Sequence, residues 1–237
     1  MPGRTIAAQR FPADDGSADA GVTAALAAYL SGEGSERAAL LALAATRLLV
    51  PVVARTGEAA RGAGGHEHTS EMALPTVVGN DGRPALLAFT SADSLARWRP
   101  DARPVPVHAT AVWQAAAQET GAVVIDLAGP VPVAVTGARL AMRAAGSPPP
   151  FPEQDPDVAR AAAAAAAAEP VIAAVRLLPG GQSCDLTLQV TLAPGAEPAG
   201  QPAQQAVGRV AAGIVAAAAG AVRRGIEVAV TSAGEPV

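Results

Sequence analysis

The sequence predicts an α/β (α+β) protein of two small domains, each with a mixed sheet and helices packed on it. Short β-branched runs alternate with alanine-rich helical segments, and Leu, Val and Ile recur in separate clusters. A proline-rich stretch, "GSPPPFPEQDP", divides the 237 residues. We therefore expect a mobile arm over 1–16, domains over 17–147 and 157–237, and a linker over 148–156.

The first domain is predicted from local signals in order along the chain. Ser17 or Asp19 is expected to cap its first helix, and Gly121 is expected to end the helix over 109–119. Pro51 cannot donate a ladder hydrogen bond, so its strand is expected to be an edge strand or bulged. The predicted elements are helices over 17–30 and 36–45, a strand over 47–54, a hairpin over 72–89 that turns at 79–82, a helix over 91–98, a strand over 105–107, a helix over 109–119, a strand over 122–128 and a helix from Thr136 to Ala145.

The second domain reads as α-β-β-α-β, a small sheet with helices on one face. Its second strand alternates regularly, because Cys184, Leu186 and Leu188 face one way while the polar residues between them face the other. Its predicted elements are a helix from Asp157, strands over 171–178 and 184–192, a helix over 202–219 and a strand over 226–230.

Composition excludes several classes of function. The net charge is −4 with no basic block, so no nucleic-acid partner is expected. The longest apolar run, 203–222, contains Arg209 and few large side chains, so no membrane span is expected. The N-terminus lacks a signal-peptide core, which favours the cytoplasm. All basic side chains except histidine are arginine, which is typical of a high-GC, actinobacterial genome.

Three stretches together resemble the SseB family in its actinobacterial form. They are "ALLALAATRLLVPVVA", "SEMALPTVVGNDGRPALLAFTSADSLARWRPDARPVPV" and "VVIDLAGP". The resemblance covers about residues 17–147, and 155–237 are more weakly similar to the smaller C-terminal domain of the family. It implies a two-domain α/β protein without an established catalytic motif, so it supplies no active-site residue and no cofactor.

The segment "LAFTSADSLARW" (87–98) raises the question of a reactive hydroxyl at a strand-to-helix turn. A nucleophile elbow carries glycines around its serine, and none flanks Thr90 or Ser91. Either hydroxyl would instead cap the helix, with Asp93 completing a T-x-x-D variant of the capping box. Phe89 and Trp98 are expected to anchor the core rather than form a docking surface.

The remaining reactive side chains have simpler explanations than catalysis. His66, Glu67 and His68 lie in a glycine-rich loop without a third evident ligand, so no metal is expected. Cys184 is predicted to be a buried apolar thiol, and His108 a capping or surface group. Asp126 ends a buried strand, where carboxylates of parallel sheets are often functional, but "DLAGP" also reads as an ordinary turn.

Two functions remain from this reasoning. The first is a non-catalytic regulatory or adaptor protein that binds an unidentified protein partner. The alternative is a metabolite-binding protein or unassigned enzyme that uses a cleft of the first domain. Eight residues of the first domain form the candidate surface for a partner or ligand, if the structure brings them together. They are Phe89, Thr90, Ser91, Asp93, Arg97, Trp98, His108 and Asp126. A homodimer through the second domain, at an exposed edge of strand 184–192, is a third hypothesis.

Overall fold

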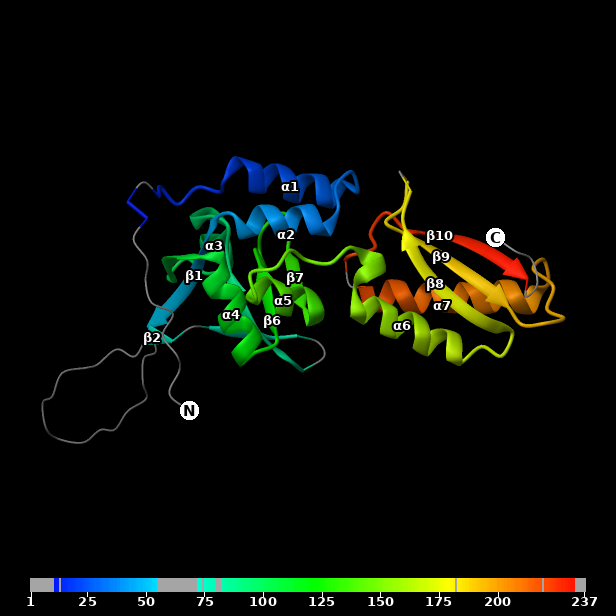
Figure 1. Ribbon diagram of the computed structural model, residues 1–237. Helices are drawn as coiled ribbons and strands as arrows, with labels where there is room; N and C mark the ends of the chain where they lie inside the picture. The colour runs from blue at the N-terminus through cyan, green and yellow to red at the C-terminus, as the bar shows by residue number, and fades with distance from the viewer. Residues whose placement is uncertain are drawn as a thin grey trace, which may run out of the picture. The chain divides into compact units, whose positions relative to one another are not determined.

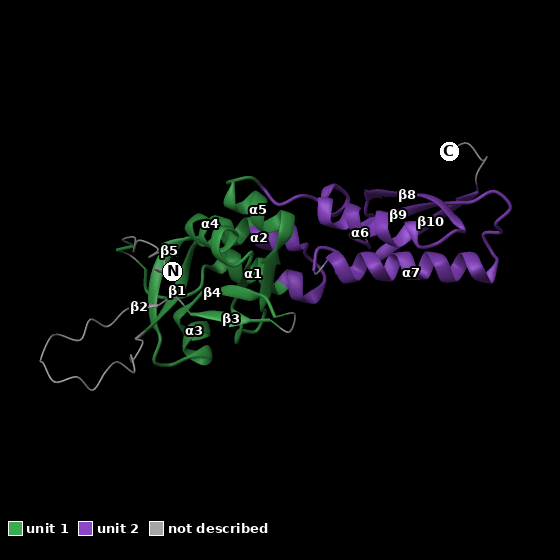
Figure 2. Ribbon diagram, turned by 90° about the horizontal axis from the view of Figure 1, so that it is seen from below, with its two compact units in different colours: residues 1–27, 41–147 green, residues 28–40, 148–237 purple. Residues whose placement is uncertain are grey.

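The computed structural model describes residues 11–12, 14–54, 72–73, 75–79, 82–181, 183–218 and 220–232 (Figure 1). The chain divides into two compact units (Figure 2). Unit 1 comprises residues 1–27 and 41–147, and unit 2 comprises 28–40 and 148–237. Helices and mixed sheets occur in both, which confirms the predicted α+β class. The predicted loop over 55–71 and residues 1–10 of the predicted arm lie outside the described residues.

Unit 1 contains a three-stranded sheet in the order β2-β1-β5 and a four-stranded sheet in the order β3-β4-β6-β7. An isolated antiparallel bridge, Leu49 to Phe89, joins them. The elements are α1 (Ala20–Ser31) and α2 (Glu36–Ala44), both shared with unit 2, then β1 (Arg47–Ala54), β2 (Met72–Ala73), β3 (Thr76–Val78), β4 (Pro84–Ala88), α3 (Ala92–Trp98), β5 (Arg103–His108), α4 (Ala109–Glu119), β6 (Ala122–Ile125), β7 (Val133–Thr136) and α5 (Gly137–Ala144).

Strands β4 and β6 form the centre of the larger sheet and run parallel, with Leu86 opposite Val123. Every residue of β4 after Pro84 is buried, as expected for a strand covered on both faces. Phe89 and Leu95 are fully buried in one cluster, and the Trp98 ring lies 5.6 Å from the Phe89 ring. The prediction that these aromatic side chains fasten α3 to the core is confirmed.

Pro51 does not mark an edge or bulged strand, so that prediction is wrong. Strand β1 is the middle strand of its sheet, and Pro51 pairs in regular register with Pro104 of β5. On the other side, β1 meets Phe89 through Leu49 and meets β2 only at Val53 and Ala54. Pro51 lies between these two contacts, where no strand in the described part of the chain pairs with it on that side, so its missing N–H breaks no ladder bond there.

The predicted helix signals are mostly confirmed. The Asp19 carboxylate, not Ser17, accepts the Val22 N–H at 3.0 Å and caps α1. Gly121 has φ +70° directly after α4, the left-handed conformation that favours glycine. Thr136 occupies the N-cap position of α5, but its side chain makes no capping hydrogen bond.

Unit 2 has one three-stranded sheet in the order β10-β9-β8, in which β9 is antiparallel to β8 and parallel to β10. The inward side chains of β9 are buried against both helices, and the alternate ones are half-buried, as predicted. The elements are η1 (Pro152–Gln154), α6 (Pro156–Ala167), β8 (Ile172–Pro179), β9 (Leu186–Leu192), α7 (Gln201–Ala218) and β10 (Ile226–Ser232). Figure 1 shows α6 and α7 on the same side of this sheet.

The structure groups residues 28–40 with unit 2, whereas the sequence analysis assigned them to the first domain. The Arg37 guanidinium donates to the Pro149 carbonyl at 3.0 Å and lies 4.1 Å from the Phe151 ring. Arg223 donates to the Leu30 carbonyl at 2.9 Å. The residues of the expected linker therefore belong to unit 2, where η1 also contacts α6 and β8.

A buried carboxylate fixes the turn between α7 and β10. One oxygen of Asp185 accepts the backbone N–H groups of Arg223 and Arg224 at 2.8 and 2.7 Å. Its other oxygen accepts the Arg224 Nε–H at 2.8 Å. Asp185 immediately precedes β9, so this contact ties the start of the central strand to the start of β10.

We expect Asp185→Ala to lower the free energy of unfolding of unit 2 by about 3 kcal/mol, because it removes the acceptor of the Arg224 Nε–H and of two backbone N–H groups. Urea denaturation followed by circular dichroism measures this change. The control is Glu197→Ala, which removes a carboxylate at an exposed position of unit 2 and should change stability little. Equal losses in the two variants would contradict the role assigned to Asp185.

Candidate functional site

Thr90 and Asp126 meet at the carboxyl ends of the parallel strands β4 and β6. The Thr90 hydroxyl donates to one carboxylate oxygen of Asp126 at 2.6 Å, and the Thr90 backbone N–H donates to the other at 2.9 Å. Both residues are buried, with 5 % and 3 % of their surface exposed. Ligands often bind at this end of a parallel sheet. Here the position is filled by a hydrogen-bonded pair, which we call the Thr90–Asp126 junction.

Asp126 also begins the turn predicted from "DLAGP". Its φ of +51° is left-handed, a conformation that aspartate tolerates better than most residues. The Gly129 N–H donates to the Asp126 carbonyl at 2.7 Å, and a Cβ on Gly129 would lie 2.8 Å from the Asp126 Cβ. Burial raises the pKa of the Asp126 carboxyl, while hydrogen bonds from Thr90 and Ser94 oppose that rise.

Ser91 caps α3, which resolves the choice between the two hydroxyls. Its Oγ accepts the Ser94 N–H at 3.0 Å, and its backbone is extended as an N-cap requires. The Ser91 and Ser94 hydroxyls lie 3.1 Å apart. A serine nucleophile needs a base positioned to take its proton. The buried carboxylate of Asp126 is instead bonded to Thr90 and Ser94.

The other predicted site residues do not converge on the junction. Asp93 and Arg97 are exposed on α3, Trp98 is half-buried against Phe89, and Phe89 itself is fully buried. His108 is exposed at the end of β5, where it occupies the N-cap position of α4 without a side-chain capping bond. A single cleft formed by all eight predicted residues is therefore absent.

Arg47 is not among the site residues predicted from the sequence, yet its guanidinium links three segments of unit 1. It makes a bidentate ion pair with Asp14, at 2.9 Å from Nε and 2.8 Å from Nη2. It also donates to the carbonyls of Ser17, at 2.5 Å, and of Thr90. The ion pair lowers the pKa of Asp14, chiefly through the hydrogen bond from Arg47. This part of the predicted arm is thus bound to the domain.

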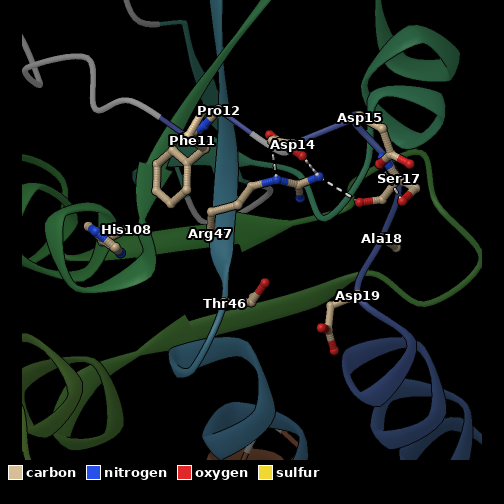
Figure 3. Close-up of a pocket in the computed structure, with 10 residues that line it drawn as sticks. All are labelled: Phe11, Pro12, Asp14, Asp15, Ser17, Ala18, Asp19, Thr46, Arg47 and His108. Atoms are coloured by element: carbon tan, nitrogen blue, oxygen red, sulfur yellow. Dashed lines mark hydrogen bonds and ion pairs between the residues drawn. The ribbon is translucent and has the colours of Figure 1, made fainter.

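An open pocket of about 490 Å³ lies beside this ion pair (Figure 3). The rings of Phe11 and His108 meet edge to face there, with centroids 4.9 Å apart. Asp15 and Asp19 are exposed at its rim, and hydrogen bonds from Ser17 lower the pKa of Asp15. The residues that line it are Phe11, Pro12, Asp14, Asp15, Ser17, Ala18, Asp19, Thr46, Arg47 and His108.

The structure also bears on the predictions for Cys184, for a metal site and for a membrane span. Cys184 is buried, accepts the Gly181 N–H at 3.2 Å and lies 3.8 Å from a Glu227 oxygen. Among the described residues, no three His, Cys, Asp or Glu side chains are grouped to hold a metal ion. His66, Glu67 and His68 lie outside that part of the chain. Within it, no helix combines the length and apolar character needed to cross a bilayer.

These features define an α+β protein whose polar groups at the strand ends are bonded to one another, beside an open acidic pocket. The model of the SseB protein N-terminal domain matches residues 22–142, which is more than half of the chain. The chain therefore belongs to the SseB family, as its sequence resemblance predicted. No curated protein and no solved structure matches it. The matched range contains the whole Thr90–Asp126 junction.

We expect Thr90→Val to lower the free energy of unfolding of unit 1 by about 1–3 kcal/mol, because it removes a donor from a buried carboxylate. Ser91→Ala should cost about 1 kcal/mol through the lost cap. Tryptophan fluorescence in urea reports on unit 1, since both tryptophans, Trp98 and Trp113, belong to it. Thr110→Val, at an exposed position on α4, is the control. No difference between Thr90→Val and this control would contradict the structural role.

Asp126 should also give unit 1 a specific dependence on pH. Its folded pKa is raised above the unfolded value of about 3.9, so its contribution to stability is complete below that value. The contribution is lost as the pH rises through the folded pKa. The unfolding free energy of wild type minus that of Asp126→Asn should therefore fall with rising pH. A difference that stays constant or rises would contradict the raised pKa; urea titrations of both proteins at several pH values measure it.

Proposed function

We propose that the protein is a non-catalytic binding protein, and that the pocket of unit 1 receives a basic segment of a protein partner. The observation that supports this most directly is the charge balance of the pocket. Asp14 already neutralises Arg47, so Asp15 and Asp19 leave an excess of negative charge at the rim. A basic side chain would complement this charge.

The aromatic wall of the pocket favours the same class of partner. An arginine or lysine side chain attracts aromatic ring faces and carboxylates at once, and Phe11 lies in the same pocket as the acidic residues. The open shape supports a protein segment over a free metabolite. Small-molecule sites enclose most of the surface of their ligand, whereas this pocket is largely open to solvent.

The hydrogen bonds of the Thr90 and Ser91 hydroxyl groups support a role without catalysis. The Thr90 hydroxyl donates to a buried carboxylate, and the Ser91 hydroxyl oxygen accepts a helix N–H. Each residue thus acts in holding β4, β6 and α3 together. An enzyme that uses a small metabolite in this domain is the second candidate, and it would need a site other than the Thr90–Asp126 junction.

Two further proposals come from the sequence. The use of arginine in place of lysine supports an actinobacterial protein, and a cytoplasmic location stays a prediction. The α-β-β-α-β order of residues 156–232 supports assignment of unit 2 to the smaller C-terminal domain of the family.

The test is binding of a fluorescent peptide with three arginines separated by glycines, measured by fluorescence anisotropy. Wild type should bind it and should not bind the glutamate counterpart. Asp15→Asn with Asp19→Asn should weaken binding severalfold, because the two charges are lost while asparagine still accepts the Ser17 and Val22 N–H groups. Added salt should weaken wild-type binding in the same direction.

The control for this experiment is Asp93→Asn, which removes an exposed carboxylate of unit 1 outside the pocket. It has the same change in net charge per residue and should leave the affinity unchanged. Failure of the wild-type protein to bind the arginine peptide would overturn the proposed site. An equal loss of affinity in Asp93→Asn would overturn it as well.

A further inference from the structure

Strand β10 forms one edge of the unit 2 sheet. All seven of its residues, from Ile226 to Ser232, pair in parallel register with β9 on one side. On its other side no strand of the described residues pairs with it. A row of backbone N–H and C=O groups along such an edge can bind another strand.

The opposite edge, β8, carries features that prevent strand addition. Its register shifts between Ile172 and Ala174, Arg176 is exposed, and Pro179 ends the strand. Irregular register, charge and proline are means by which natural sheets block an edge. Strand β10 has no proline, no basic residue and an unbroken register.

The core of unit 2 is incompletely covered at β10. Val230 pairs with Val190, which is fully buried, yet Val230 itself is 38 % exposed. Val228, on the same face, is only partly buried against the core. This edge therefore leaves apolar surface that another strand and its side chains would cover.

We propose that β10 pairs antiparallel with β10 of a second copy of this chain, with Ala229 opposite Ala229. In this register Val228 of each copy lies opposite Val230 of the other, so the valines of both copies extend one apolar face. Glu227 lies opposite Thr231, and no two carboxylates oppose each other. The sequence "IEVAVTS" thus complements itself about its central alanine.

A second copy fits this edge better than an unrelated peptide, because the pairing is symmetric and ends at two chains. A two-fold axis uses the same edge on both copies. The joined sheet would have a β8 strand at each end, and both of these edges are blocked. The proposal replaces the hypothesis that strand 184–192 pairs between copies, because that strand, β9, already has neighbours on both sides.

The test is the molar mass of the full chain by size-exclusion chromatography with light scattering over a range of concentrations. Wild type should reach twice the single-chain mass of 23.3 kDa. Val230→Lys should raise the dissociation constant about tenfold or more, because two lysines would enter the shared apolar row. The exposure of Val230 lets the single chain tolerate this change. Val215→Lys, at a valine of α7 that is 48 % exposed, is the matched control and should leave the mass unchanged.

A second variant tests the register. Ala229→Cys should form a disulfide between copies on mild oxidation, because opposite residues of an antiparallel pair lie within disulfide reach. Ala212→Cys, exposed on α7, should not. A wild-type mass of one chain at every concentration would overturn the proposal, as would a dimer that Val230→Lys leaves intact. Failure of Ala229→Cys to cross-link within a wild-type-like dimer would overturn the register.

Discussion

The hydrogen-bonded pair of Thr90 and Asp126 is the constraint on which the arrangement of unit 1 depends. It joins residues 36 positions apart, at the carboxyl ends of two parallel strands, next to the backbone bond from the Asp126 N–H to the Ala88 carbonyl at 3.0 Å. The same two residues start the segments that follow: Thr90 leads into the Ser91 cap of α3, and Asp126 into the turn before β7. Burying a carboxylate is costly unless donors surround it, and Thr90 supplies two of them.

Arg47 extends this constraint to the N-terminal segment. Its guanidinium donates to the Thr90 carbonyl and pairs with Asp14, so the start of β1, the end of β4 and residues 14–17 are bound together. The Ala92 N–H donates to the Gly16 carbonyl at 2.7 Å, which ties the same segment to α3. Unit 2 uses a similar device, because Asp185 accepts backbone donors 38 and 39 positions away. In both units a buried aspartate therefore connects a strand end to a turn.

Local patterns predicted much of this fold, since caps, glycine ends and alternation act within a few residues. The Ser91 cap, the antiparallel pairing of β3 with β4 and the buried face of β9 all follow from such signals. The pairing of Arg47 with Asp14 could not be predicted, because 33 residues separate them and no local pattern links them. The grouping of residues 28–40 with unit 2 could not be predicted for the same reason, since Arg37 and Pro149 meet across 112 residues. The prediction of an edge or bulged strand at Pro51 was wrong because a middle strand tolerates proline between two contacts. On that side β1 meets Phe89 before Pro51 and β2 after it.

Native-state hydrogen exchange tests most directly whether the Thr90–Asp126 junction is a fixed structural element. The Thr90 amide is bonded to a buried carboxylate, and the Phe89 amide donates to the Leu49 carbonyl within the sheet. If the junction holds unit 1 together, the two amides exchange only when the whole unit unfolds, with the same free energy of opening. Exchange at Thr90 that is orders of magnitude faster than at Phe89 would show that the junction opens on its own, and would contradict this account.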